Sequence, residues 1–153
     1  MPETENREIP HPRSPKTILF VCEYNSCRSQ LAEALARSLA PAGWRILSAG
    51  LQRTVVSDEV TRVLQEAGVP ATGLSSKSLD DVRSEGVDEV VVLAPDALAA
   101  ARRTFPRARV IEWPMADPLR IAGGSGAVRQ EVRRARDELR RRVRDHLRTG
   151  AGS

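Results

Sequence analysis

The sequence predicts a small doubly wound α/β domain, in which a four-stranded parallel sheet carries helices on both faces. The chain has 153 residues, which suits one domain with a single core. Four short apolar runs alternate with segments of helical periodicity, the order typical of parallel sheets. Aromatic residues make up only 3%, so we expect a core of aliphatic side chains.

The predicted strands are short, nearly uninterrupted apolar runs, as expected for strands buried on both faces. They cover residues 17–21, 44–48, 89–93 and 109–113. Ala49 and Gly50 are expected to close the second strand.

The predicted helices cover residues 29–39, 57–67 and 95–103, and a long C-terminal helix follows the glycine-rich turn 123–126. Ser57 is the expected N-cap of the second helix, and Pro95 suits the first turn of the third.

The C-terminal helix carries nine arginines between positions 129 and 148, and the formal net charge of the chain is +4. A basic stretch of this kind raises the question of nucleic-acid binding. However, apolar residues recur there at three- or four-residue steps, which predicts an amphipathic helix with its arginines on the solvent side. We therefore expect no nucleic-acid partner, and we place His146 on the polar side of the helix.

The ends of the chain differ from the domain between them. Residues 1–15 contain four prolines, and this composition predicts a disordered arm. We expect the domain to cover residues 16–149 and a flexible tail to cover residues 150–153. No apolar run reaches the roughly 18 residues of a membrane helix, and the start lacks a secretion signal. With only two cysteines, the chain is expected to be cytoplasmic, without a membrane partner.

The segment 22–29, CEYNSCRS, follows the first predicted strand directly. Open α/β sheets bind ligands at this edge, and a loop at a helix N-terminus directs backbone N–H groups toward an oxyanion. Residues 23–28 are the expected oxyanion-binding residues: Glu23, Tyr24, Asn25, Ser26, Cys27 and Arg28. Arg28 would clamp two oxygens, Cys22 would be the thiolate nucleophile, and Ser29 could hydrogen-bond the thiolate. Asn25 could brace the loop through its amide.

A thiolate that attacks an oxyanion needs a proton donor for the leaving oxygen. Asp117 is the candidate, because it follows the fourth predicted strand and therefore lies on the same edge of the sheet. Pro118 would stiffen its loop.

The sequence resembles the low-molecular-weight tyrosine phosphatase superfamily, most closely its arsenate reductase branch. The resemblance covers about residues 17–149 and is carried by segments 20–33 (FVCEYNSCRSQLAE), 48–50 (SAG) and 117–118 (DP). Gln30, where phosphatases usually carry proline, Trp113, and Leu119 in place of an aromatic residue favour the arsenate branch. The resemblance implies the phosphotyrosine phosphatase I-like fold, with Cys22 as nucleophile, Arg28 as clamp and Asp117 as acid.

The resemblance leaves two enzymatic functions open, arsenate reduction and, as the alternative, phosphate monoester hydrolysis through a Cys22 phosphoenzyme. A non-enzymatic oxyanion sensor is a third hypothesis, which the combination of thiol and acid disfavours. Thioredoxin-coupled relatives use two further cysteines after the third strand, and this chain has none there. We therefore expect no bound cofactor but a low-molecular-weight thiol, mycothiol or glutathione, as co-substrate, with a glutaredoxin-like or mycoredoxin-like reductant.

Three further features of the motif lead to expectations: its second cysteine, its two residues after Cys22, and its match to a potassium site. Cys27 could form a protective redox disulfide with Cys22, or it could simply pack in the core. The family usually has glycine where Tyr24 stands, so we expect Glu23 and Tyr24 to face the rim. The arsenate branch can hold potassium through residues matching Asn25, Glu33 and Ser48, but Lys77 stands near the remaining acidic ligand. We therefore predict no bound metal.

Overall fold

The computed structural model describes residues 14–149. The predicted tail, and the predicted arm except for residues 14 and 15, lie outside the described residues. Within residues 14–149, no helix is both long enough and apolar enough to cross a membrane.

The fold is built on one four-stranded parallel sheet in the order β2-β1-β3-β4, which confirms the predicted class. The strands are β1 (Thr17–Cys22), β2 (Arg45–Gly50), β3 (Glu89–Val92) and β4 (Arg109–Glu112). β2 ends at Gly50, within the pair expected to close it, but it extends two residues beyond the predicted range 44–48. Both residues still pair with β1, Ala49 opposite Val21 and Gly50 opposite Cys22.

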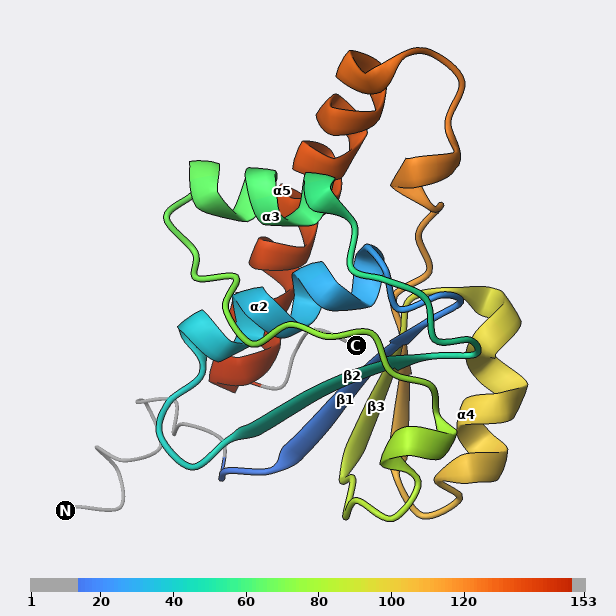
Figure 1. Cartoon of the computed structure of the whole chain (residues 1–153). Helices are drawn as coiled ribbons and strands as arrows, with labels where there is room; N and C mark the ends of the chain where they lie inside the picture. The colour runs from blue at the N-terminus through green and yellow to red at the C-terminus, as the bar shows by residue number, and fades with distance from the viewer. Residues whose placement is uncertain (1–13, 150–153) are drawn as a thin grey trace, which may run out of the picture.

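Helices cover both faces of the sheet, with α2, α3 and α5 on one face and α4 on the other (Figure 1). The α-helices are α2 (Arg28–Leu39), α3 (Asp58–Glu66), α4 (Leu98–Thr104) and α5 (Ser125–Thr149). Three short 3-10 helices are η1 (Asp80–Val82), η2 (Pro95–Ala97) and η3 (Pro118–Arg120). η2 forms the first turn of the helix predicted over residues 95–103, whereas the sequence did not predict η1 and η3. The hydroxyl of Ser57 caps α3 by accepting from Glu59 N.

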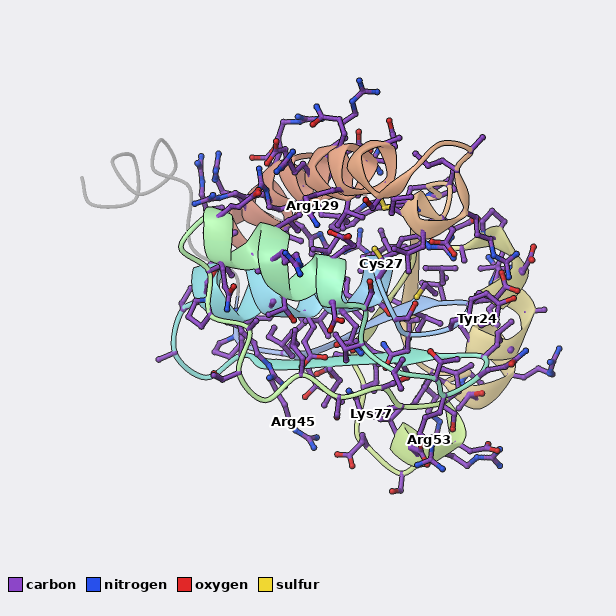
Figure 2. The ribbon with its side chains drawn as sticks, turned by 45° about the horizontal axis from the view of Figure 1, so that its top comes forward. Tyr24, Cys27, Arg45, Arg53, Lys77 and Arg129 are labelled. Atoms are coloured by element: carbon purple, nitrogen blue, oxygen red, sulfur yellow. The ribbon has the colours of Figure 1, made fainter. Side chains whose placement is uncertain are left out.

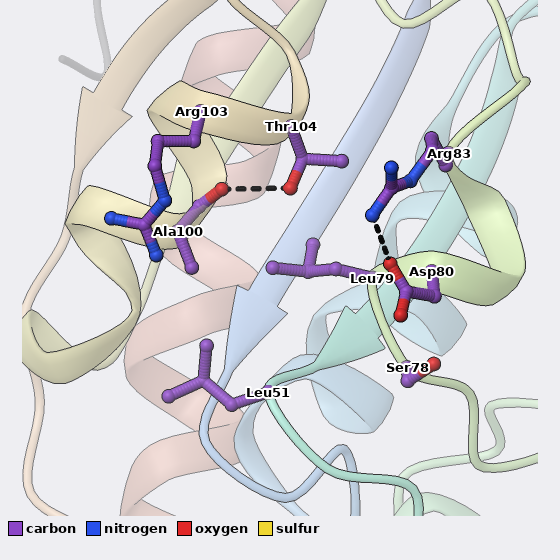
Figure 3. A pocket seen from close by; sticks show the side chains of 8 residues that line it. All are labelled: Leu51, Ser78, Leu79, Asp80, Arg83, Ala100, Arg103 and Thr104. Atoms are coloured by element: carbon purple, nitrogen blue, oxygen red, sulfur yellow. Dashed lines mark hydrogen bonds and ion pairs between the residues drawn. The ribbon is translucent and has the colours of Figure 1, made fainter.

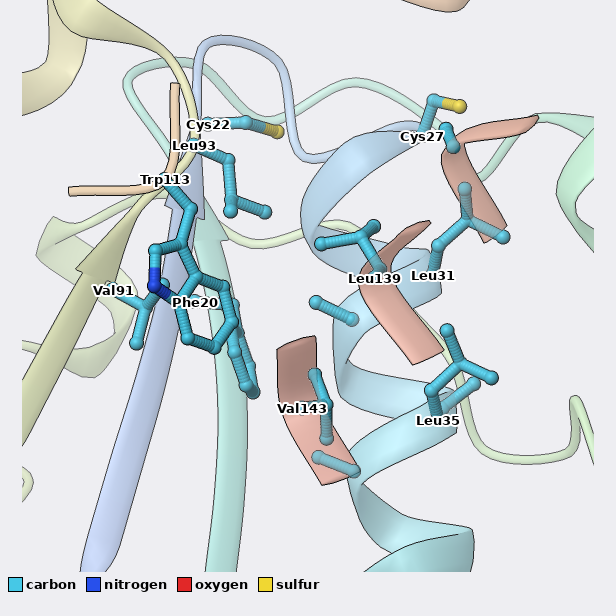
Figure 4. Close-up of a cluster of buried hydrophobic side chains, with 14 of the residues drawn as sticks. Phe20, Cys22, Cys27, Leu31, Leu35, Val91, Leu93, Trp113, Leu139 and Val143 are labelled. Carbon is cyan, nitrogen blue, oxygen red and sulfur yellow. The ribbon is translucent and has the colours of Figure 1, made fainter. Parts of the chain in front are cut away.

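Alternate residues of β1 divide the core into two clusters. Ile18, Phe20 and Cys22 face α2 and α5, whereas Leu19 and Val21 face the layer that contains α4. Figure 4 shows the first cluster, with Phe20 and Trp113 on the sheet side and the leucines of α2 on the helix side. Because Cys22 ends a strand packed on both faces, its backbone position is fixed.

The amphipathic prediction for α5 is confirmed on its apolar side. Residues at helical spacing are buried against α2 and the sheet: Val132, Ala135, Leu139, Val143 and Leu147. The placement of His146 on the polar side is wrong, because its side chain is 1% exposed and its Nε2 lies 2.8 Å from Glu89 Oε1. The imidazole and the Trp113 ring also form a T-shaped pair, with their centroids 5.6 Å apart.

Several arginines of α5 pair with carboxylates of α3, and Figure 2 labels one of them, Arg129, where the two helices meet. Arg129 pairs with Glu59, while Arg133 and Arg136 both pair with Glu66. Arg136 also donates to the carbonyl of Val63. These ion pairs join α5 to α3 and neutralise part of the positive charge of α5.

The paired carboxylate of Glu66 predicts a loss of stability in acid. Hydrogen bonds from Arg133, followed by its charge and that of Arg136, lower the pKa of Glu66 to about 2. A pKa lower in the folded than in the unfolded state stabilises the fold above the ordinary pKa of 4.5, and this contribution disappears as the pH falls toward 2.

We therefore expect wild type to exceed Glu66→Gln in free energy of unfolding at about pH 7, and this excess to shrink by about pH 3. Urea titrations of both proteins at the two pH values measure the difference. An equal difference at both values would contradict a contribution from the Glu66 charge.

Candidate active site

A tight loop joins the end of β1 to the start of α2 and passes over the end of β2. Asn25 adopts φ 51°, a left-handed conformation that asparagine tolerates better than most residues. A side chain on Gly50 would lie 2.6 Å from Asn25 N and 2.9 Å from Glu23 O. The close approach of this loop therefore requires glycine at position 50.

The sulfur of Cys22 lies at the end of a buried hydrogen-bond chain. Ser29 Oγ is 2.9 Å from Cys22 Sγ and accepts from Asn25 Nδ2 at 2.8 Å. The same amide nitrogen donates to Ser48 Oγ at 3.0 Å, and Ser48 donates to Glu33 Oε1 at 2.5 Å. All five side chains are almost fully buried.

The donors and acceptors of this hydrogen-bond chain can be assigned from the chemistry of its side chains. Asn25 Oδ1 accepts from Lys77 N at 2.6 Å, which fixes the orientation of the amide and directs Nδ2 toward both serines. Ser48 uses its hydrogen on Glu33, so it accepts from Asn25. Ser29 likewise accepts from Asn25, which leaves the Ser29 hydrogen for the sulfur of Cys22. The arrangement can stabilise negative charge on that sulfur.

Arg28 is the first residue of α2, and its side chain lies under the loop that follows β4. It is 5% exposed, donates from Nη1 to the carbonyl of Met115 at 3.0 Å, and has Nη2 at 3.9 Å from Asp117 Oδ2. A buried guanidinium at a helix N-terminus, next to the loop, suits the binding of an oxyanion.

Asp117 is brought to the same place by η3. Its Oδ1 accepts from Leu119 N at 3.0 Å, so the carboxylate caps this short helix, and Pro118 occupies the first turn. The side chain of Asp117 is 13% exposed, and its other oxygen faces Arg28. The structure thus brings together Cys22, Arg28, Ser29 and Asp117, the four residues predicted to be catalytic.

The site opens into a hollow of about 570 Å³. Two loops and η3 line it with mixed polar and apolar side chains: Tyr24, Ser26, Thr54, Val55, Ser57, Asp117, Leu119 and Arg120. Val55 is 74% exposed at its rim. Tyr24 and Glu23 are half-buried, and the phenol of Tyr24 reaches Arg120, a partner that the sequence did not suggest.

The residues that match the potassium ligands of the arsenate branch do not fit a cation here. Glu33 Oε1 faces Lys77 Nζ at 3.7 Å, and Glu33 Oε2 faces Arg37 Nη2 at 2.5 Å. Lys77 also donates to the carbonyl of Ser75. Two cationic side chains already neutralise the carboxylate, and Asn25 Oδ1 is bonded to a backbone N–H. Within residues 14–149, no cluster of three or more histidine, cysteine or acidic side chains could hold a metal ion.

Cys27, the second predicted redox residue, is 2% exposed at the N-cap of α2. Burial, followed by the nearby charges of Asp117 and Cys22, raises the pKa of the Cys27 thiol well above its usual range. Figure 4 shows both cysteines as side chains of the first core cluster. A thiol in this environment is a weak nucleophile, because the thiolate is the reactive form.

Two supporting contacts of the loop were not predicted. Gln30 Nε2 donates to the carbonyls of Asn25 and Ser75 at 2.9 and 2.8 Å, and thus joins the loop to the segment before η1. Ser26 accepts at its carbonyl from Ser57 N, which connects the loop to α3. The contacts of Gln30 could have been anticipated, because a glutamine in the first turn of a buried helix requires polar partners for its amide.

A second hollow of about 380 Å³ lies between η1 and α4 (Figure 3). Leu51 and Leu79 lie among its lining residues, and Arg83 at its edge is paired with Asp80. None of the residues predicted to bind an oxyanion lines it.

Comparisons with known proteins agree with this geometry. A family model described as low molecular weight phosphotyrosine protein phosphatase matches residues 17–148. Arsenate reductase 1 of Bacillus cereus (strain ATCC 10987 / NRS 248) is 33% identical over 135 residues, which cover 88% of this chain and 96% of the relative.

Two solved structures show the same likeness. An arsenate reductase in the phosphate binding state has a TM-score of 0.73 at 25% identity, covering 86% of this chain and 96% of its own. An arginine phosphatase from Geobacillus stearothermophilus has a TM-score of 0.71 at 27% identity, covering 87% and 90%. The sheet order, the loop after β1 and the family match lead to one conclusion: the chain belongs to the low molecular weight phosphotyrosine protein phosphatase family.

Proposed function

We propose that this enzyme reduces arsenate, with Cys22 as nucleophile and a low-molecular-weight thiol as reductant. The observation that supports the proposal is that two adjacent residues at the start of α2 contact the other two groups: Ser29 contacts the Cys22 sulfur, and Arg28 faces Asp117. The relatives named arsenate reductase support the choice of substrate.

The first step forms a covalent adduct. Arsenate would bind to the backbone N–H groups of residues 23–27 and to Arg28, where positive charge offsets its own. The thiolate of Cys22 attacks the arsenic of hydrogen arsenate, the bond from arsenic to its hydroxyl breaks, and that hydroxyl leaves as water with a proton from Asp117. Ser29 holds its hydrogen toward sulfur and stabilises the thiolate before attack.

The second step reduces arsenic by two electrons. An external thiol attacks the sulfur of Cys22, the electron pair of the sulfur–arsenic bond stays on arsenic, and arsenite leaves. The two sulfurs are oxidised to a mixed disulfide between Cys22 and the thiol, which a glutaredoxin-like or mycoredoxin-like dithiol protein then reduces. The burial and raised pKa of Cys27 support an external thiol, because the chain has no other cysteine.

Phosphate monoester hydrolysis is the second candidate, because the family model and a structural neighbour are phosphatases. The same residues would form a Cys22 phosphoenzyme, and water would attack phosphorus where a thiol attacks sulfur in the reductase. The two functions thus differ in the second step.

Arsenite production separates the two candidates. Reduced protein is supplied with arsenate and with mycothiol plus mycoredoxin, glutathione plus glutaredoxin, or thioredoxin, and Cys22→Ser serves as the blank. We expect turnover with a low-molecular-weight thiol system and none with thioredoxin alone. No arsenite in any system, together with Cys22-dependent hydrolysis of an aryl phosphate, would replace the reductase by the phosphatase.

The hydrogen bond of Ser29 gives a further prediction. Ser29→Ala removes the donor to the sulfur, and a hydrogen bond to a charged group contributes about 1.5–3 kcal/mol. We expect the rate of Cys22 alkylation by iodoacetamide at neutral pH to fall roughly ten- to hundredfold, with a parallel loss of kcat. Ser38→Ala, a serine at the other end of α2, is the control, and an unchanged alkylation rate in Ser29→Ala would contradict the assigned donor.

A further inference from the structure

Two side chains meet across the mouth of the site. The guanidinium of Arg120 lies 4.8 Å from the centroid of the Tyr24 ring and also donates a hydrogen bond to the Tyr24 hydroxyl. Tyr24 belongs to the loop after β1, and Arg120 to η3 after β4. The contact therefore joins the oxyanion loop to the loop that carries Asp117.

Both partners are anchored on their own side of the mouth. The carbonyl of Tyr24 accepts from Thr54 Oγ1 at 2.9 Å and from Ser76 Oγ at 3.5 Å. Arg120 Nε lies 3.8 Å from Asp117 Oδ2. The pair is thus held at one end by hydroxyls from the loop after β2 and the loop after α3, and at the other by the carboxylate of the proposed acid.

The reacting groups lie below this contact. Cys22 is 1% exposed and Arg28 is 5% exposed, whereas Tyr24 and Arg120 line the open hollow above them. Asp117, which lies between the two arginines, also lines the hollow. Tyr24 and Arg120 thus border the same hollow as Asp117, the proposed acid.

We propose that the Tyr24–Arg120 pair determines specificity by admitting a free oxyanion and disfavouring phosphate monoesters. A free arsenate or phosphate ion lies wholly in the loop below the pair. An ester bound there extends its alcohol group into the hollow, where it competes for space with the Tyr24–Arg120 pair. This inference rests on the proposed function, since it takes Cys22 and its loop as the reaction site.

Charge alone does not separate the two classes of substrate. Arg120 is 61% exposed at the mouth, and its guanidinium is turned onto the phenol and the Asp117 carboxylate. The phosphate of an ester carries the same charge as the free ion, so Arg120 attracts both. The discrimination therefore comes from the space that the alcohol group of an ester needs beside the pair.

A double-mutant cycle tests the proposal. For wild type, Arg120→Ala, Tyr24→Ala and the double variant, kcat/KM for p-nitrophenyl phosphate is compared with kcat/KM for arsenate. We expect the ratio of ester to arsenate to rise roughly tenfold in each single variant, the factor expected from a lost cation–π contact and a charged hydrogen bond. The double variant should rise no further, because either change alone breaks the pair. Arg53→Ala, an exposed arginine paired with Asp81 nearby, is the matched control.

Failure of this proposal is distinguishable from failure of arsenate reduction. If no arsenite forms in any thiol system, the inhibition constant of inorganic phosphate against p-nitrophenyl phosphate replaces the arsenate measurement. A ratio that stays within twofold of wild type in both single variants would overturn the role of the pair. Additive effects in the double variant would also overturn it, since the two residues would then act separately.

Discussion

Replacement of Cys22 by serine is expected to abolish arsenate reduction and aryl phosphate hydrolysis alike, by at least about a thousandfold. The hydroxyl is a far weaker nucleophile than the thiolate, and it cannot form the mixed disulfide that releases arsenite. The geometry places Cys22 rather than Cys27 beside Ser29, at 2.9 Å. Initial rates of both reactions, at equal concentrations of folded protein, measure the loss.

Cys27→Ala is the matched variant for this prediction. It removes a thiol of the same loop that is buried and has a raised pKa. We expect a loss far smaller than that of Cys22→Ser, because Cys27 is not the attacking group. A larger loss in Cys27→Ala than in Cys22→Ser would contradict Cys22 as the nucleophile and indicate Cys27 instead. If peroxide inactivation of Cys27→Ala were fully reversible by a mild reductant, Cys27 would not protect Cys22 through a disulfide.

Arg28→Lys is expected to lower kcat/KM for arsenate about a hundred- to a thousandfold, comparable with the loss of one oxyanion donor in other enzymes. Lysine keeps the charge but loses the planar fork that binds two oxygens at once. It also loses one of the two contacts of Arg28, with the Met115 carbonyl and with Asp117. The inhibition constant of inorganic phosphate should rise as well, since binding and reaction use the same clamp.

Arg136→Lys controls for the loss of a partly buried arginine. Its side chain is 14% exposed and holds α3 through Glu66 and the Val63 carbonyl, away from the proposed site. We expect a lower melting temperature with kcat/KM per folded molecule retained. If Arg28→Lys affected only melting temperature, Arg28 would be structural rather than a substrate clamp.

Much of the fold could be predicted because it follows from local patterns. The apolar runs of β1 and β3 are buried on both faces, and such runs predict strands directly. The spacing of Val132, Leu139 and Val143 likewise predicted the buried side of α5. Cys22 and Asp117 could be placed on one edge, since the carboxyl ends of parallel strands meet there. The strand order still required the structure.

The features that the sequence missed depend on contacts between distant residues. Tyr24 and Arg120 are 96 positions apart, and His146 and Glu89 are 57 apart. His146 follows Val143 by three residues and so shares its apolar side, but a histidine there reads as polar until its buried carboxylate partner is known. The ion pairs of Glu66 with Arg133 and Arg136 likewise depend on how α3 packs against α5.

The mass of Cys22 after a single turnover tests the central claim most directly. Reduced protein is mixed with arsenate and one low-molecular-weight thiol, without a protein reductant, and the arsenite formed is compared with the modified protein. We expect one mixed disulfide on Cys22 for each arsenite released, with Cys27 unmodified. Arsenite released with an intramolecular Cys22–Cys27 disulfide, or formed in the absence of added thiol, would contradict it.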